Sequence, residues 1–173
     1  MSTEAWLRGP IEGIAPHLMP AAHSLVQARE DLARAVEGLT PAELWERPGG
    51  AASIGFHLRH IAGSLDRLLT YARGEQLSSE QIATLKAEGE PGSPPATVEE
   101  LLAAADAALA RALEQLAATP ESELLAPREV GRAKLPSNVL GLLFHAAEHT
   151  YRHTGQIITT AKVVRSPAAE ATA

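Results

Sequence analysis

Three observations predict an all-α protein, a four-helix bundle. Four long segments carry apolar residues at the spacing of one helix face, and capping or stop residues bracket these segments. Aromatic residues make up only 3% of the 173 residues, which disfavours domains rich in β-strands. Hydrophobic residues make up 45%, so a chain of this length can bury a core of its own.

The first two long helices are expected near the start of the chain. One covers residues 18–37 and stops at Gly38. A short helix follows Thr40, which opens a capping-box pattern. Ser53 is expected to cap the second long helix, residues 54–73.

The other two long helices begin with equally clear signals. Thr97-Val98-Glu99-Glu100 is a capping box that opens a helix to residue 118. Ser137 or Asn138 is expected to cap the last helix, which runs to about residue 162. Each helix has an apolar face to bury, which is typical of a bundle.

The connections decide how these helices are ordered. Residues 74–96 are long enough to cross a helix of about 30 Å, so the second and third long helices can run parallel. We therefore expect an up-down-down-up bundle with short helices in its connections. Residues 127–135 are expected to form a loop, and no strand is predicted. Residues 1–165 are predicted to form a single domain, and residues 166–173 a disordered tail.

Charge and cysteine content exclude several classes of function. The chain has 15 basic and 21 acidic residues, a net charge of −6, which disfavours binding to nucleic acid or to an anionic membrane. It has no cysteine, so it can form neither a thiolate metal site nor a cysteine nucleophile. No signal-peptide pattern and no apolar run of about 18 residues is visible in the sequence, and we expect a cytoplasmic location.

Five of the seven histidines fall in two short windows. His57 and His60 lie three residues apart in the second long helix, on one face. His145, His149 and His153 follow one another at steps of four in the last helix, within about 80° of its circumference. The face of His57 and His60 also carries apolar residues such as Ile61 and Leu68, so it should point partly inward.

Inward-facing imidazoles need partners, which are acids, one another or a metal ion. A divalent ion such as zinc, nickel or ferrous iron accepts three nitrogens and keeps open coordination positions, the pattern of a catalytic site. A fourth protein ligand would close the site and make it structural. In the third alternative, the histidines bind no metal and only satisfy one another within the bundle.

The two windows resemble those of the DinB/YfiT-like superfamily of metal-binding four-helix bundles. The resemblance is carried by Ser53-Ile54-Gly55-Phe56-His57-Leu58-Arg59-His60-Ile61-Ala62-Gly63-Ser64 and by His149-Thr150-Tyr151-Arg152-His153-Thr154-Gly155-Gln156-Ile157. That family has one histidine in the second long helix and an HxxxH pair in the last, commonly followed by Gly-Gln. Carried over by position, the implied ligands are His60, His149 and His153. The implied ion is zinc or nickel before iron or manganese.

The resemblance also implies an activity and a partner. Related proteins include S-transferases and an isomerase that use low-molecular-weight thiols, and many members pair as homodimers. The expected function is therefore a metal-dependent enzyme that activates a water or thiol nucleophile for attack on a small-molecule substrate. Without cysteine in the chain, the thiol must be a cosubstrate. The alternative is a non-catalytic metal sensor or helical interaction module. No catalytic residue other than the ligands is assigned.

Two further groups of residues have alternative roles. His57 and His145 each precede an implied ligand by about one turn. Each either supports or lines the metal pocket, or is a core or rim histidine bonded to a backbone carbonyl or a carboxylate. His57 could also replace His60 as a ligand. Arg128, Arg132 and Lys134 form a basic cluster that either is solvated or holds a carboxylate of a thiol cofactor.

Overall fold

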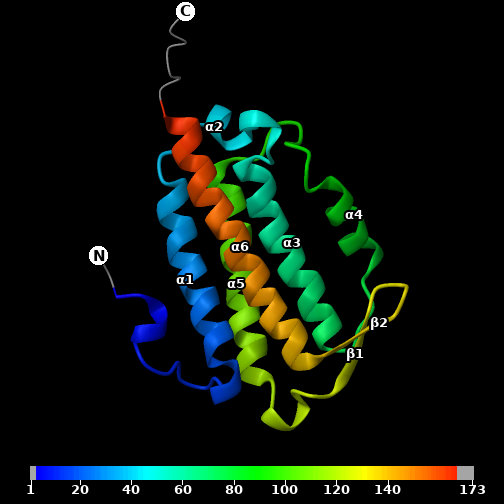
Figure 1. Cartoon of the computed structure of the whole chain (residues 1–173). Coiled ribbons are helices and arrows are strands. Elements are labelled where there is room, and N and C mark those ends of the chain that lie inside the picture. The colour runs from blue at the N-terminus through cyan, green and yellow to red at the C-terminus, as the bar shows by residue number, and fades with distance from the viewer. Residues whose placement is uncertain (1–2, 167–173) are drawn as a thin grey trace, which may run out of the picture.

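The computed structural model describes residues 3–166 and contains the predicted bundle of four long helices. These are α1 (Met19–Val36), α3 (Ile54–Ala72), α5 (Val98–Ala118) and α6 (Val139–Arg165). In Figure 1, α1 and α6 run upward while α3 and α5 run downward. The predicted all-α class and up-down-down-up order are therefore confirmed.

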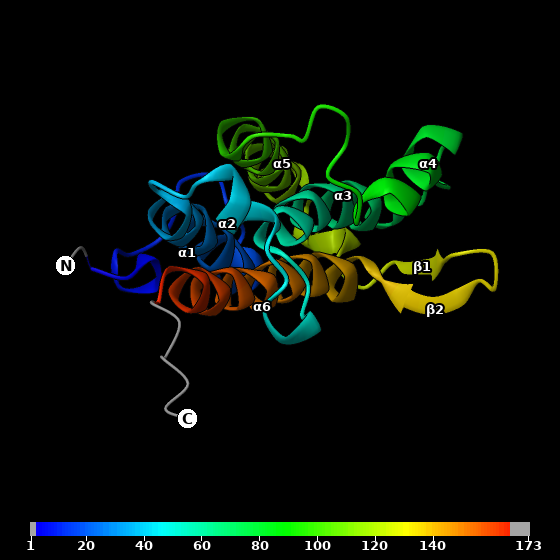
Figure 2. The same ribbon diagram turned by 90° about the horizontal axis from the view of Figure 1, so that it is seen from above.

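The bundle places α3 beside α6, the two helices that carry the histidine windows. Both α3 and α1 pack chiefly against α5 and α6, so α3 and α1 lie on a diagonal (Figure 2). The core between the helices is aliphatic. Its fully buried large side chains are Leu18, Leu25, Leu32, Leu44, Ile54, Leu58, Ile61, Leu65, Leu109, Leu116, Leu143 and Ile157.

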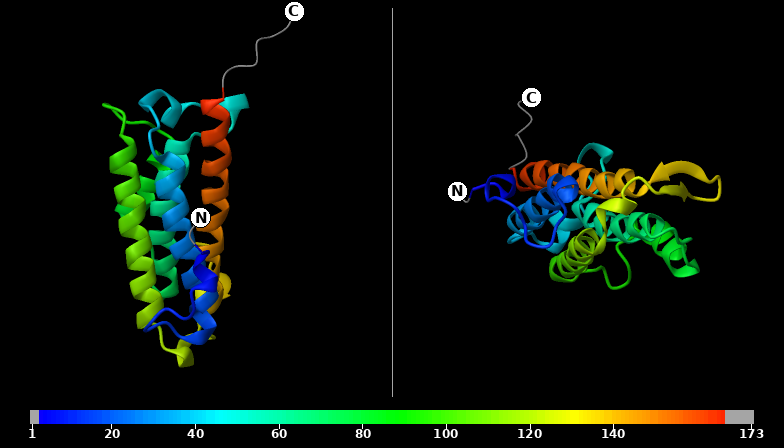
Figure 3. Two further views of the ribbon diagram at one scale, coloured as in Figure 1. Left: turned by 90° about the vertical axis from the view of Figure 1, so that its left-hand side faces the viewer. Right: turned by 90° about the horizontal axis from the view of Figure 1, so that it is seen from below.

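Short helices occupy the connections, as predicted. The α-helical ones are α2 (Pro41–Trp45) and α4 (Ser79–Ala87). Single 3₁₀ turns occur at Ala5–Leu7, Pro16–Leu18, Pro48–Gly50 and Glu121–Glu123. The first of these turns packs against α1 (Figure 3). Capping boxes open α2, α4 and α5, because in each the cap side chain and the third helical residue satisfy one another's backbone N–H groups.

The expectation of a loop at residues 127–135 is wrong, because this segment belongs to a β-hairpin. Strands β1 (Pro127–Val130) and β2 (Leu135–Asn138) pair antiparallel and project beyond the helices (Figure 2). The turn is possible because Gly131 and Lys134 adopt φ values of 70° and 50°. Two strands of four residues are too short to show a clear alternating pattern, which is why the strands were not predicted.

Trp45 of α2 contacts both α3 and the long connection at one end of the bundle. Its ring covers Gly55 of α3 so closely that a Cβ there would lie 2.7 Å from the indole. Its Nε1 donates a hydrogen bond to the carbonyl of Ala96, 3.1 Å away, at the end of the long connection. The guanidinium of Arg59 lies over the ring, 5.1 Å from its centre.

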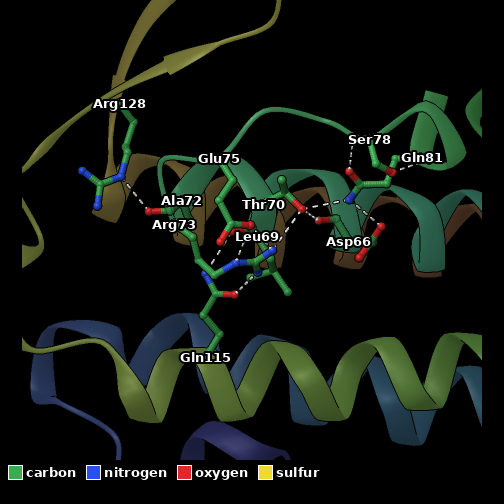
Figure 4. A network of polar contacts seen from close by, with 10 residues as sticks. All are labelled: Asp66, Leu69, Thr70, Ala72, Arg73, Glu75, Ser78, Gln81, Gln115 and Arg128. Atoms are coloured by element: carbon green, nitrogen blue, oxygen red, sulfur yellow. Dashed lines mark hydrogen bonds and ion pairs between the residues drawn. The ribbon is translucent and has the colours of Figure 1, made fainter.

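Polar contacts fix α4 and the hairpin to the other end of α3 (Figure 4). Nε2 of Gln81, in α4, donates to Asp66 at 2.7 Å and to Thr70 at 2.8 Å. Nε of Arg128, in β1, donates to the carbonyl of Ala72 at the last turn of α3, 2.7 Å away. Both α4 and the hairpin are therefore held against the C-terminal half of α3.

Between residues 3 and 166, none of the helices combines the length and the apolar character needed to cross a membrane. Of the predicted tail at 166–173, only Ser166 is described, as the residue that ends α6. The remaining tail residues lie outside the described part of the chain.

Candidate metal centre

Three histidines converge at the contact between α3 and α6. His60 comes from α3, while His149 and His153 come from one face of α6, where a step of four residues stacks side chains. One nitrogen from each ring lies within 4.8 Å of the other two. Nε2 of His60 is 2.8 Å from Nε2 of His149, and the ring of His153 is centred 4.6 Å from each of the other two rings.

A buried carboxylate holds the other nitrogen of His60. Oε2 of Glu88 accepts a hydrogen bond from Nδ1 of His60 at 2.7 Å, and Oε1 accepts one from Nη1 of Arg67 at 2.6 Å. Burial acts to raise the pKa of Glu88, but the hydrogen bonds from His60 and Arg67 outweigh it and lower this pKa below its ordinary value. The carboxylate is therefore ionised at neutral pH, and Nδ1 of His60 carries a proton.

His153 is supported by a fourth histidine. Its Nδ1 lies 2.9 Å from Nδ1 of His57, which is 5% exposed. The structure groups His60, and not His57, with His149 and His153. His57 thus lies beside His153 and outside the group of three.

His149 is incompletely satisfied by protein groups. Its Nε2 faces His60, but its Nδ1 is buried and has no hydrogen-bond partner. A buried polar atom without a partner costs about 1–3 kcal/mol, and native proteins contain few of them. This unsatisfied ring, within a cluster of imidazoles, fits a site that holds an ion.

The protonation states also suit a metal ion. Burial, with a smaller contribution from neighbouring His60, lowers the pKa of His149 and of His153 to about 4. Both rings are therefore neutral at pH 7, and a neutral imidazole has the lone pair that a metal ligand must offer. Three nitrogen donors are the set that zinc, nickel or iron accepts.

His145 lies outside this cluster. Its side chain is half exposed, and its Nδ1 is 3.3 Å from Oε2 of Glu148. Glu148 also accepts a hydrogen bond from Arg152, one turn further along α6. His145 is thus a rim histidine bonded to a carboxylate, one of the two alternatives considered for it.

Two of the three residues of the basic cluster, Arg128 and Lys134, are engaged elsewhere. Arg128 caps α3 through the carbonyl of Ala72. Nζ of Lys134 pairs with Glu129 at 3.3 Å, in an exposed contact. These contacts do not connect the cluster with the histidines.

Glu88 and Arg67 were not predicted from the sequence. Glu88 lies in the long connection, where no periodic pattern marks it as buried. The available signal was Gly63, in the middle of α3, because a helix interior disfavours glycine unless something approaches closely. A Cβ on Gly63 would lie 2.3 Å from Oε1 of Glu88 and 2.7 Å from Nη1 of Arg67.

Two cavities border this buried pair along α3 and α4. One, of about 390 Å³, is lined by Gly63, Arg67 and Thr84 among others. The second, of about 330 Å³, shares Gly63 and Thr84 and reaches Glu88. The lining of these two cavities includes none of the three histidines.

The fold and the histidine cluster define a class of protein, a helical bundle able to bind a metal ion between two of its helices. The family model of the DinB superfamily matches residues 24–157, which include all three histidines. The chain belongs to the DinB superfamily, as its sequence motifs implied. Among curated proteins, no sequence matches it.

Proposed function

We propose that the protein binds a divalent metal ion through His60, His149 and His153, and that it is a metal-dependent enzyme. The observation that carries the proposal is the convergence of three imidazole nitrogens within 4.8 Å, from two adjacent helices. Zinc and nickel are proposed before iron and manganese, because imidazole suits these borderline ions best.

The proposed reaction is attack by a water molecule or a low-molecular-weight thiol on a small electrophile. A bound divalent ion would supply the acidity that lowers the pKa of such a nucleophile to near neutrality. The protein's part is to hold and orient: Glu88 orients His60, and His57 supports His153. Among the described residues the cluster has three donors, which would leave coordination positions for a nucleophile. The thiol would be a cosubstrate, since the chain has no cysteine.

A second candidate is a non-catalytic helical module whose histidines satisfy one another. The observation that favours it is direct contact between imidazoles, at 2.8 Å for His60 and His149 and at 2.9 Å for His57 and His153. In this alternative α3 and α6 are held together without an ion.

Elemental analysis of the untagged protein separates the two candidates. After reconstitution with zinc or nickel, the wild type should hold about one ion per chain, as should the rim variant His145→Ala. His60→Ala, His149→Ala and His153→Ala should each lose it, because each removes one of three donors. A wild type that stays metal-free with zinc, nickel, manganese and ferrous iron would exclude the metalloenzyme and favour the helical module.

A positive result would be followed by a test for catalysis. The metal-loaded protein should consume glutathione, mycothiol or bacillithiol in the presence of an electrophilic acceptor, and His153→Ala should not. Metal binding without any such turnover would favour a metal sensor over a thiol transferase.

We also propose that the protein forms a homodimer, as the family resemblance implies. Large apolar side chains are exposed beside the groove between α1 and α6: Trp6 at 62%, Phe144 at 58% and Tyr151 at 46%. A second copy covering them would remove this apolar surface from water. Light scattering after gel filtration should give twice the monomer mass, and Phe144→Glu should reduce it to the monomer mass.

A further inference from the structure

We infer that Glu88 is a positioning residue of the metal centre, which fixes the Nδ1 proton of His60 and so presents Nε2 of that ring to the ion. The inference rests on the proposed metal site. It assigns a function to the long connection between α3 and α5, because Glu88 is the residue that ends α4.

The carboxylate of Glu88 is buried and fully hydrogen-bonded. Glu88 is 3% exposed, and both of its oxygens are engaged, one by His60 and the other by Arg67. A carboxylate only accepts hydrogen bonds, so the nitrogen of His60 that faces it must carry a proton. In a neutral ring the lone pair is then on Nε2, the nitrogen that faces His149.

One face of α3 provides both the space and the hydrogen-bond donors for this carboxylate. His60, Gly63 and Arg67 lie at i, i+3 and i+7, on one face of the helix. His60 and Arg67 each donate to Glu88, while Gly63 leaves the space that its Oε1 occupies. Arg67 is itself only 8% exposed. Buried charges are costly to desolvate, and nothing in packing alone requires them at this position.

Hydrogen bonds hold the connection against α3 on both sides of Glu88. Nη2 of Arg59 donates to the carbonyl of Pro91 at 2.9 Å, and Nη1 of the same side chain donates to the carbonyl of Glu90. On the other side of Glu88, Gln81 of α4 is bonded to Asp66. The carboxylate is thus held between two attachments of the connection to α3.

The test is the affinity for zinc, measured by competition with a chromophoric chelator. Glu88→Gln should bind zinc 10- to 100-fold more weakly than the wild type, the loss that is usual when the partner of a ligating histidine is removed. Glu80→Gln is the matched control, because Glu80 is an exposed glutamate of the same helix. It should bind zinc as the wild type does. An affinity of Glu88→Gln within threefold of the wild type would overturn the inference.

A second variant covers the case in which Glu88→Gln leaves Arg67 buried without a partner and does not fold. Glu88→Met combined with Arg67→Met removes both charges and the oxygen that accepts the Nδ1 proton of His60, and methionine is close to glutamate in volume. It should fold, as judged by circular dichroism, and should show the same weakened zinc affinity. Wild-type affinity in this folded variant would also overturn the inference.

A spectroscopic readout separates this role from a purely structural one. In ¹⁵N-labelled, metal-free wild type, the Nδ1 proton of His60 should be visible as a protected imidazole signal, assigned by its loss in His60→Ala. The signal should persist in Glu80→Gln and vanish in the double variant. Its persistence in the folded double variant would mean that Glu88 does not hold His60.

The outcomes for the two proposals differ. If neither the wild type nor Glu80→Gln binds zinc, the proposed metal site is wrong, and the role of Glu88 toward a metal ion is wrong with it. If the wild type binds zinc and His60→Ala does not, the site is supported. Retention of zinc by Glu88→Gln would then contradict the positioning role alone.

Discussion

At the scale of single residues, buried neutral histidines make the metal-free protein sensitive to acid. Burial lowers the pKa of His57, His149 and His153 from the ordinary 6.5 to about 4. Below pH 6.5 the unfolded chain binds protons at these rings, whereas the folded chain does not until about pH 4. The free energy of unfolding should therefore decrease as the pH is lowered from 6.5 toward 4.

Urea denaturation in the presence of a chelator at pH 7, 6 and 5 would measure this decrease. These values lie above the ordinary carboxyl pKa values of about 4, so most carboxylates of the unfolded chain stay ionised. His57→Asn should make the dependence shallower, because it removes one of the three rings. A free energy of unfolding that is constant from pH 7 to 5 would contradict the assigned protonation states.

At this same scale, the sequence revealed the histidines but not their partners. The spacing of four in the last helix placed His149 and His153 on one face, and the family motif selected His60 from the two candidates in the second long helix. The structure brings these three rings together, and their role as ligands stays a prediction. Glu88 could not be found by spacing, because it meets His60 across 28 residues through the fold of a connection.

At the scale of the helix, two glycines provide a matched comparison. Gly63→Ala should lower the free energy of unfolding by about 1–3 kcal/mol, because its Cβ would collide with Glu88 and Arg67, which are bonded to each other and buried. Gly155→Ala, in α6, should raise it by about 0.5–1 kcal/mol. Nothing lies within 4 Å of that Cβ, and alanine is the better helix former.

Urea denaturation of both variants in chelator would measure the two changes. Equal effects of the two substitutions would mean that the space at Gly63 is not required. The comparison is informative because both glycines lie inside long helices, so the difference reports on the close approach alone.

Local contacts at the helix ends explain which helices and strands were predictable. The starts of α3, α5 and α6 were predicted because Ser53, Thr97 and Asn138 cap their own helices through local contacts. The hairpin was missed because its register depends on pairing between strands that are only four residues long. Local signals thus located the helices, whereas the hairpin depended on pairing between two short strands that carry no such signal.

At the scale of the whole molecule, the proposed ion would join α3 to α6. Zinc at 100 times its dissociation constant should raise the free energy of unfolding by about 2.7 kcal/mol, because it binds only the folded chain. His153→Ala should show no such rise. Calcium should also give none in the wild type, since it prefers oxygen ligands. Thermal denaturation with and without each ion would test this, and equal stabilisation by calcium and zinc would contradict a three-imidazole site.

The order of the helices was predictable at this scale because the connection of residues 74–96 is long enough to return along the bundle. The contact between a carboxylate of this connection and the histidines was not predictable, because the sequence shows no periodic signal there. The segment that permits the parallel course of α3 and α5 is therefore also the segment that contacts the candidate metal centre.

The position of Trp45 allows its intrinsic fluorescence to report on the packing of three segments. The chain has two tryptophans, and Trp6 is 62% exposed while Trp45 is sandwiched between Gly55 and Arg59 and bonded to Ala96. Iodide in solution would quench the fluorescence of the exposed indole first. The remaining emission would then come from Trp45, at the junction of α2, α3 and the long connection. Its wavelength of maximum emission would increase if these three segments separated and exposed the indole to water.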